Sequence, residues 1–129
     1  MTTPLATEDG EYELVRQYIL FGILFRAVMV DWSRLQLVPL KLSYQAMIDG
    51  AFQELSRWAE RQHHQMRRLL QQRGCTVVRA RREGHVYMVH YQQRGYVREA
   101  LYTIEILQAE CQELIDLWMR NQQRGEKRA

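Results

Sequence analysis

The segment Tyr18–Val30, YILFGILFRAVMV, constrains the fold of this chain more than any other. Arg26 is its only charged residue, and a helix built from it is apolar on nearly every side. A helix that is apolar all round must be covered all round, by the rest of its own chain or by a partner. Its length of about 13 residues is well short of the roughly 20 that span a bilayer. We therefore predict a buried central helix and no membrane span.

The size and composition of the chain predict one folded domain, residues 1–129. The sequence has 129 residues, of which 47% are hydrophobic and 26% charged, a balance typical of globular proteins. It contains only two prolines and seven glycines, which leaves little room for linkers. We expect flexible tails at about residues 1–7 and 122–129.

The cysteines and the N-terminal charges predict a cytoplasmic protein. Cys75 and Cys111 are too few and too far apart to indicate a disulfide framework, so each is interpreted as a small apolar residue in a reducing compartment. A secretory signal begins with positive charge, but four acidic residues precede the apolar segment here.

Two long helices are predicted in the first part of the chain. The first should begin at Thr7 as the N-cap and end near Trp32–Leu35, because Pro39 cannot continue it. The second should begin at Leu42–Tyr44 and run to Arg73.

Gly74 is the expected C-terminal cap of this second helix. Its stretch Glu60–Gln65 is polar on all sides. A helix of this length is roughly 45 Å long at 1.5 Å per residue. We therefore expect its second half to project from the domain or to break near Gln62–His64.

A β-hairpin is predicted next, from Cys75–Arg82 and His85–Gln92 with Glu83-Gly84 as a two-residue loop. This loop predicts one packing face built from three cross-strand pairs: Val78 with Val89, Ala80 with Tyr87, and Thr76 with Tyr91. The opposite face would carry Cys75 and Val77 together with Arg79 and Arg81.

A third helix is predicted over Tyr96–Arg120. Apolar residues from Ala100 to Trp118 follow a repeating spacing of four and three, as on a core-facing helix stripe. The expected fold is therefore α+β and mostly helical, in the order α-α-β-β-α, with a central apolar helix, a long second helix, a basic hairpin and a closing helix.

Positive charge is concentrated in the middle third of the sequence and consists entirely of arginine. Residues 57–98 contain ten arginines against Glu60 and Glu83, a net charge of +8. Residues 1–56 contain four basic and seven acidic residues, and residues 99–129 contain four and six. The flanking regions thus carry net charges of −3 and −2.

Arginine suits phosphate recognition because its planar fork can hold two oxygens at once. We therefore predict a small non-enzymatic nucleic-acid-binding or regulatory protein, with DNA and RNA both open. The predicted binding residues are Arg61, Arg67, Arg68, Arg73, Arg79, Arg81, Arg82, Arg94 and Arg98. The alternative is a protein-interaction or assembly subunit, a homodimer for example, whose arginines meet acidic partners or the acidic sides of the third helix.

No catalytic, cofactor or metal motif accompanies these arginines, so we predict neither an enzyme nor a bound cofactor. Glu60 and His64 are four residues apart and could share a metal ion on one helix face, but His63 points about 100° away from His64. His85 and His90 face opposite sides of their strand. Solvated histidines on a basic surface are the preferred interpretation.

Overall fold

The mostly helical α+β fold is confirmed by a computed structural model, which describes residues 2–37 and 44–128, and the side chains of residues 10–37 and 44–124. The order of elements is α-α-β-β-β-α, with one strand more than predicted. The elements are α1 (Thr2–Gln36), α2 (Gln45–Gln72), β1 (Cys75–Glu83), β2 (Val86–Gln93), β3 (Tyr96–Thr103) and α3 (Ile104–Arg128).

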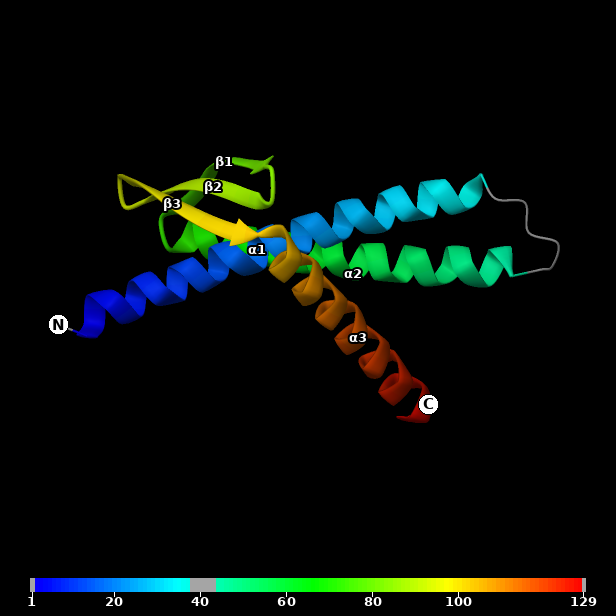
Figure 1. Cartoon of the computed structure of the whole chain (residues 1–129). Coiled ribbons are helices and arrows are strands. Elements are labelled where there is room, and N and C mark those ends of the chain that lie inside the picture. Colours follow the sequence, from blue (N-terminus) through cyan, green and yellow to red (C-terminus); the bar gives the residue numbers. More distant parts are fainter. Residues whose placement is uncertain (1, 38–43, 129) are drawn as a thin grey trace.

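The two long helices form an antiparallel pair that carries the rest of the molecule (Figure 1). The antiparallel sheet, with strand order β1-β2-β3, lies across one side of this pair. α3 leaves the end of β3, crosses the pair and then projects away from it (Figure 1). No helix in the described part of the chain combines the length and the apolar character needed to cross a membrane.

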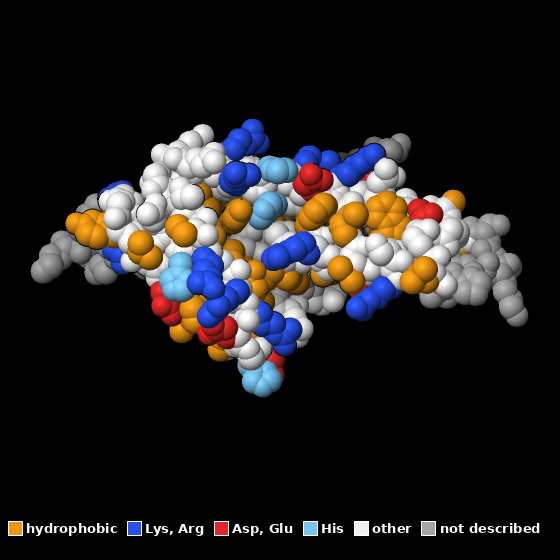
Figure 2. All heavy atoms as spheres, turned by 90° about the horizontal axis from the view of Figure 1, so that it is seen from above, with side chains coloured by type: hydrophobic (Ala, Val, Ile, Leu, Met, Phe, Trp, Pro, Cys, Tyr) orange, Lys and Arg blue, Asp and Glu red, His pale blue; other side chains and the backbone are white. Residues whose placement is uncertain are grey.

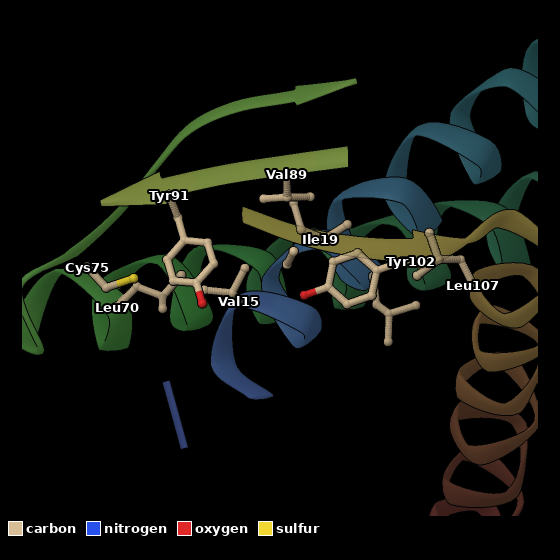
Figure 3. Packing of buried hydrophobic residues seen from close by; sticks show 10 residues of the cluster. Val15, Ile19, Leu70, Cys75, Val89, Tyr91, Tyr102 and Leu107 are labelled. Atoms are coloured by element: carbon tan, nitrogen blue, oxygen red, sulfur yellow. The ribbon is translucent and has the colours of Figure 1, made fainter. Parts of the chain in front are cut away.

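The first core cluster lies between the sheet and α1. Tyr91 of β2 and Tyr102 of β3 point from the sheet toward the helices, with Val15 and Ile19 of α1 beneath them (Figure 3). Val89 is completely buried in the same cluster. Complete burial of an aliphatic side chain of this kind contributes about 1.5–3 kcal/mol, so this cluster anchors the sheet to the helix pair.

The second core cluster joins α1, α2 and α3. Phe21, Leu24 and Val28 of α1 pack against Leu55 and Ala59 of α2, and half-buried side chains of α3 cover them. The segment predicted as the central apolar helix therefore contributes to both clusters. The last residues of this segment are exposed to solvent, since Met29 is 39% and Val30 47% exposed.

The long helices differ from prediction at their ends and in their middle. α1 begins at Thr2, before the predicted start at Thr7, and the predicted stop at Pro39 lies outside the described residues. α2 runs without a break through Gln62–His64, where His63 stacks on Tyr18 of α1 while Arg61, His64 and Gln65 are exposed. Gly74 follows α2 with a φ of 69°, the left-handed conformation expected of a C-terminal cap.

The hairpin register differs from the predicted one because the loop is displaced by one residue and β1 contains a bulge. The displaced loop places Ala80 opposite Val89, whereas Val78 has no partner and Val77 beyond it lies opposite Tyr91. The loop is Gly84-His85, with Glu83 opposite Val86. Gly84 has a φ of 62° at the first loop position, where type II′ turns place glycine.

The bulge also changes which residues of β1 face the helices. Cys75 and Val77 lie on the packing face, and not on the outer face as predicted. Arg79 and Arg81 remain on the outer face, opposite His90 and Met88. Burial raises the pKa of the Cys75 thiol to about 11, which agrees with its interpretation as a small apolar residue.

The first part of the predicted third helix, Tyr96–Thr103, is instead strand β3. Its side chains alternate between the two faces, with Ala100 and Tyr102 buried and Val97 and Leu101 exposed. The helical spacing that starts at Ala100 is coincidental there, because a two-stranded hairpin is marginally stable and a third strand completes the sheet. Arg98 therefore lies on a strand, opposite Tyr91.

Candidate functional site

A pocket of about 480 Å³ opens between α1, α2 and the β1–β2 hairpin. The residues that shape it are Tyr18, Gly22, Phe25 and Arg26 from α1, Glu60, His63 and His64 from α2, and Ala80 and Tyr87 from the hairpin. Figure 2 shows this side of the molecule, with histidine side chains near its middle and Lys or Arg side chains on both sides of them.

The His63 ring is fixed in the wall of this pocket. It stacks on Tyr18 with ring centroids 4.3 Å apart and planes 17° apart. Its Nδ1 lies 3.0 Å from the main-chain oxygen of Tyr18. Because a carbonyl oxygen can only accept, Nδ1 donates its hydrogen and Nε2 is left with a lone pair in the neutral ring.

The close approach of His63 to α1 depends on Gly22. A Cβ atom at position 22 would lie 2.9 Å from Cε1 of the imidazole, closer than real Cβ contacts. Burial in this position lowers the pKa of His63 below its ordinary value of 6.5, and the charges of His64, Arg26 and Arg67 lower it further. His63 is therefore mainly neutral at neutral pH.

Arg26 supplies a positioned cation in the same pocket. Its Nε donates to the main-chain oxygen of Gly22 at 3.3 Å, and its Nη2 donates to the Tyr87 hydroxyl at 3.3 Å. No acidic side chain in the described part of the chain forms an ion pair with it. Among the described residues, the positive charge of Arg26 therefore faces the pocket without an ion-pair partner.

The rim of the pocket carries one acid and further bases. Glu60 lies 3.6 Å from Nε2 of His64, one helical turn along α2. Arg67 lines a smaller adjoining pocket of about 230 Å³ together with Tyr18 and Cys75. Among the described residues, no three potential metal ligands lie close enough together to hold an ion.

Six of the predicted binding arginines lie on the two elements that flank the pocket. Arg61, Arg67 and Arg68 of α2 are exposed, and none forms an ion pair with another described side chain. The same holds for Arg79 of β1. The other two are also exposed: Arg81 pairs with Glu83, and Arg82 donates to the main-chain oxygen of Gly84 at 3.0 Å.

The other three predicted arginines lie elsewhere. Arg94, in the β2–β3 turn, reaches Glu11 of α1 at 3.5 Å, and the Glu11 side chain is only 1% exposed. Arg73 lies beside Gly10 of α1. With Arg98 on β3, these residues belong to a second basic region at the end of α2 and around the β2–β3 turn.

Sequence reasoning missed the residues that shape the pocket. His63 was expected to be solvated, but it is half-buried and stacked on Tyr18. Two signals pointed to this site. Gly22 interrupts an apolar helix where a larger side chain would otherwise be expected, and Arg26 is the only charge in that segment.

Comparison with known proteins gives a family but no activity. A family model described as YhjD protein matches residues 6–123, which include most of α1, all of α2, the sheet and most of α3. The chain belongs to the YhjD protein family. No curated protein and no solved structure matches it. The matched region of this YhjD family member contains every residue of the pocket and all nine predicted arginines.

Proposed function

We propose that this protein is a non-enzymatic binding protein for single-stranded nucleic acid, held between α2 and the β1 edge of the sheet. The observation that supports the proposal is that two arginine-rich elements, α2 and β1, lie beside one pocket. α2 contributes Arg61, Arg67 and Arg68, and β1 contributes Arg79 and Arg82. Exposed guanidinium groups without carboxylate partners are available to neutralise successive phosphates.

The geometry favours a single strand over a duplex. A two-stranded ribbon can enter a duplex groove when it stands free. This hairpin instead forms part of a three-stranded sheet packed on helices. Aromatic rings beside the basic elements suit unpaired bases, which stack on them in single-strand sites. Tyr18, Phe25 and Tyr87 are half-buried around the pocket.

The test is fluorescence anisotropy with labelled single-stranded DNA and RNA of about 12 nucleotides, and with a duplex of equal length, at about 50 mM salt. The decisive variant is Arg67→Glu with Arg82→Glu, because Arg67 borders the pocket system and Arg82 is the cross-strand neighbour of Tyr87. We expect it to weaken single-strand binding at least tenfold.

The matched control for this experiment is Arg34→Glu with Arg120→Glu. It makes the same charge change at exposed positions of α1 and α3, away from the pocket. We expect this control to bind within about twofold of the unmodified protein, because it leaves the arginines of α2 and β1 that would contact the phosphates unchanged. Absence of binding to every oligonucleotide at low salt would overturn the proposal.

Assembly with a second copy is the second candidate function, and α3 favours it. This helix projects from the body of the molecule (Figure 1) and exposes apolar side chains, with Ile106 57%, Leu117 43% and Met119 50% exposed. Of its four acids with described side chains, only Glu110 forms an ion pair, with Arg16 of α1. The acidic sides of α3 therefore remain available to the arginines of another molecule.

Light scattering coupled to gel filtration tests this second candidate. We expect a dimer that Leu117→Glu converts to a monomer, because the substitution places a charge on the exposed apolar side of the projecting helix. A monomer at every protein concentration would refute assembly while leaving nucleic-acid binding untouched.

A further inference from the structure

The pocket beneath the hairpin contains groups that phosphate neutralisation does not require. A binding protein that reads only the backbone needs cations at its surface. This pocket adds a neutral imidazole fixed by a helix carbonyl, a carboxylate at the rim and several aromatic rings. Together these groups suit a flat ligand that both donates and accepts hydrogen bonds.

Arg26 is the donor side of this arrangement. Two of the five N–H groups of a guanidinium are used here, one on Gly22 and one on Tyr87. These two bonds orient the planar group and leave the remaining N–H groups for a ligand. A guanidinium presents paired N–H groups to two adjacent acceptors, as it does to O6 and N7 of guanine.

His63 and Glu60 are the acceptor side. The neutral His63 ring keeps a lone pair on Nε2, because Nδ1 is bound to the Tyr18 carbonyl. Both oxygens of the Glu60 carboxylate accept hydrogen bonds, and His64 is its only described partner. Both can receive hydrogen bonds from the ring N–H and amino groups of a purine.

We infer that the pocket receives one unstacked base of the bound strand and prefers guanine, because Arg26 faces the acceptors of the base while Glu60 and His63 face its donors. This inference rests on the proposed single-strand binding. Guanine offers one arginine two adjacent acceptors, O6 and N7, and it also carries the ring N–H and amino donors that a carboxylate and a neutral imidazole can accept. The pocket has a volume of about 480 Å³, which lies within the usual range for ligand sites, roughly 300–1,000 Å³.

The experiment compares the affinities for an all-thymine strand of about 12 nucleotides and for the same strand with one central guanine or adenine. The strand with guanine should bind about tenfold more tightly than the other two, the effect of one bidentate arginine contact. Arg26→Lys should remove this preference, because lysine keeps the charge but not the fork. Arg34→Lys, on the exposed side of the same helix, should retain it.

A second pair of variants tests the position of His63 without changing any charge. Gly22→Ala forces the imidazole to move and should lower the guanine preference at least threefold. Gly50→Ala introduces the same methyl group into α2, where no atom other than those of the adjacent helix backbone lies within 4 Å of it, and should change nothing. Thermal unfolding followed by circular dichroism establishes that each variant is folded.

The outcomes separate this inference from the function on which it rests. Equal affinity for all three strands, with binding still weakened at least tenfold in Arg67→Glu/Arg82→Glu, would overturn the guanine pocket and leave single-strand binding intact. A guanine preference that survives both Arg26→Lys and Gly22→Ala would place base recognition outside this pocket and also overturn the inference. No binding of any strand would overturn both proposals.

Discussion

Folding weakens proton binding by the His63 ring. Burial lowers its pKa below 6.5, so the folded protein binds fewer protons than the unfolded chain as the pH falls through this value. Stability from this residue is complete above about pH 6.5 and is lost as the pH falls toward the lower folded pKa. We therefore expect His63→Gln to reduce the loss of unfolding free energy between pH 7.5 and 5.5.

Urea denaturation at several pH values measures this effect. The control is His85→Gln, because His85 is exposed in the β1–β2 loop and has no packed neighbour of the kind that Tyr18 provides for His63. Carboxylates titrate in both variants, so only the difference between the two pH profiles reports His63. Identical profiles for His63→Gln and His85→Gln would contradict the assignment.

In the β2–β3 turn, Arg94 occupies a position where arginine is unusual. Arg94 and Gly95 have φ angles of 50° and 87°, and positive φ at both loop positions is the pattern of a type I′ turn. Asparagine or glycine is usual at the first position, but Arg94 reaches the buried Glu11 at 3.5 Å. The second oxygen of Glu11 has no described partner.

We expect Arg94→Asn to lower the unfolding free energy by about 1–3 kcal/mol, although asparagine fits the turn better. The cause is a carboxylate left buried without a counter-charge. Adding Glu11→Gln should restore most of this loss, since a neutral amide has less need of the guanidinium. Denaturant melts of the two single variants and the double variant measure the coupling. Arg94→Asn with unchanged or increased stability would show that turn preference outweighs the ion pair.

The elements also show how far the sequence could predict this protein. The two long helices and the strands around Gly84 followed from local signals: apolar periodicity, a capping glycine and a two-residue loop. The third strand did not, because its helical spacing was ambiguous and only the tertiary requirement for a wider sheet decides it. The bulge at Val78 was likewise invisible, since one unpaired residue leaves no local signature.

The candidate site was predictable only in part, for a related physical reason. The basic segments of α2 and β1 are local in sequence and were recognised from charge alone. The pocket between them needs Tyr18, Gly22 and Arg26 from a helix about forty residues away from His63. Such contacts depend on how α1 and α2 pack, which periodicity indicates only as a buried face.

At the scale of the whole molecule, the uneven distribution of charge makes the salt dependence of binding informative. Each phosphate neutralised on a single strand contributes a slope of about −0.7 to the logarithm of affinity against the logarithm of salt concentration. Contacts from Arg61, Arg67, Arg68, Arg79 and Arg82 therefore predict a total slope of about −3.5. Arg68→Gln should reduce its magnitude by about 0.7. Arg26→Lys should leave the slope unchanged, because that residue is assigned to the base and keeps its charge.

Anisotropy titrations at four or more salt concentrations measure these slopes. A slope near zero would show that the strand is not held through its phosphates, and the flanking arginines would then have another partner, of which the acidic sides of α3 in a second copy are the nearest chemical match.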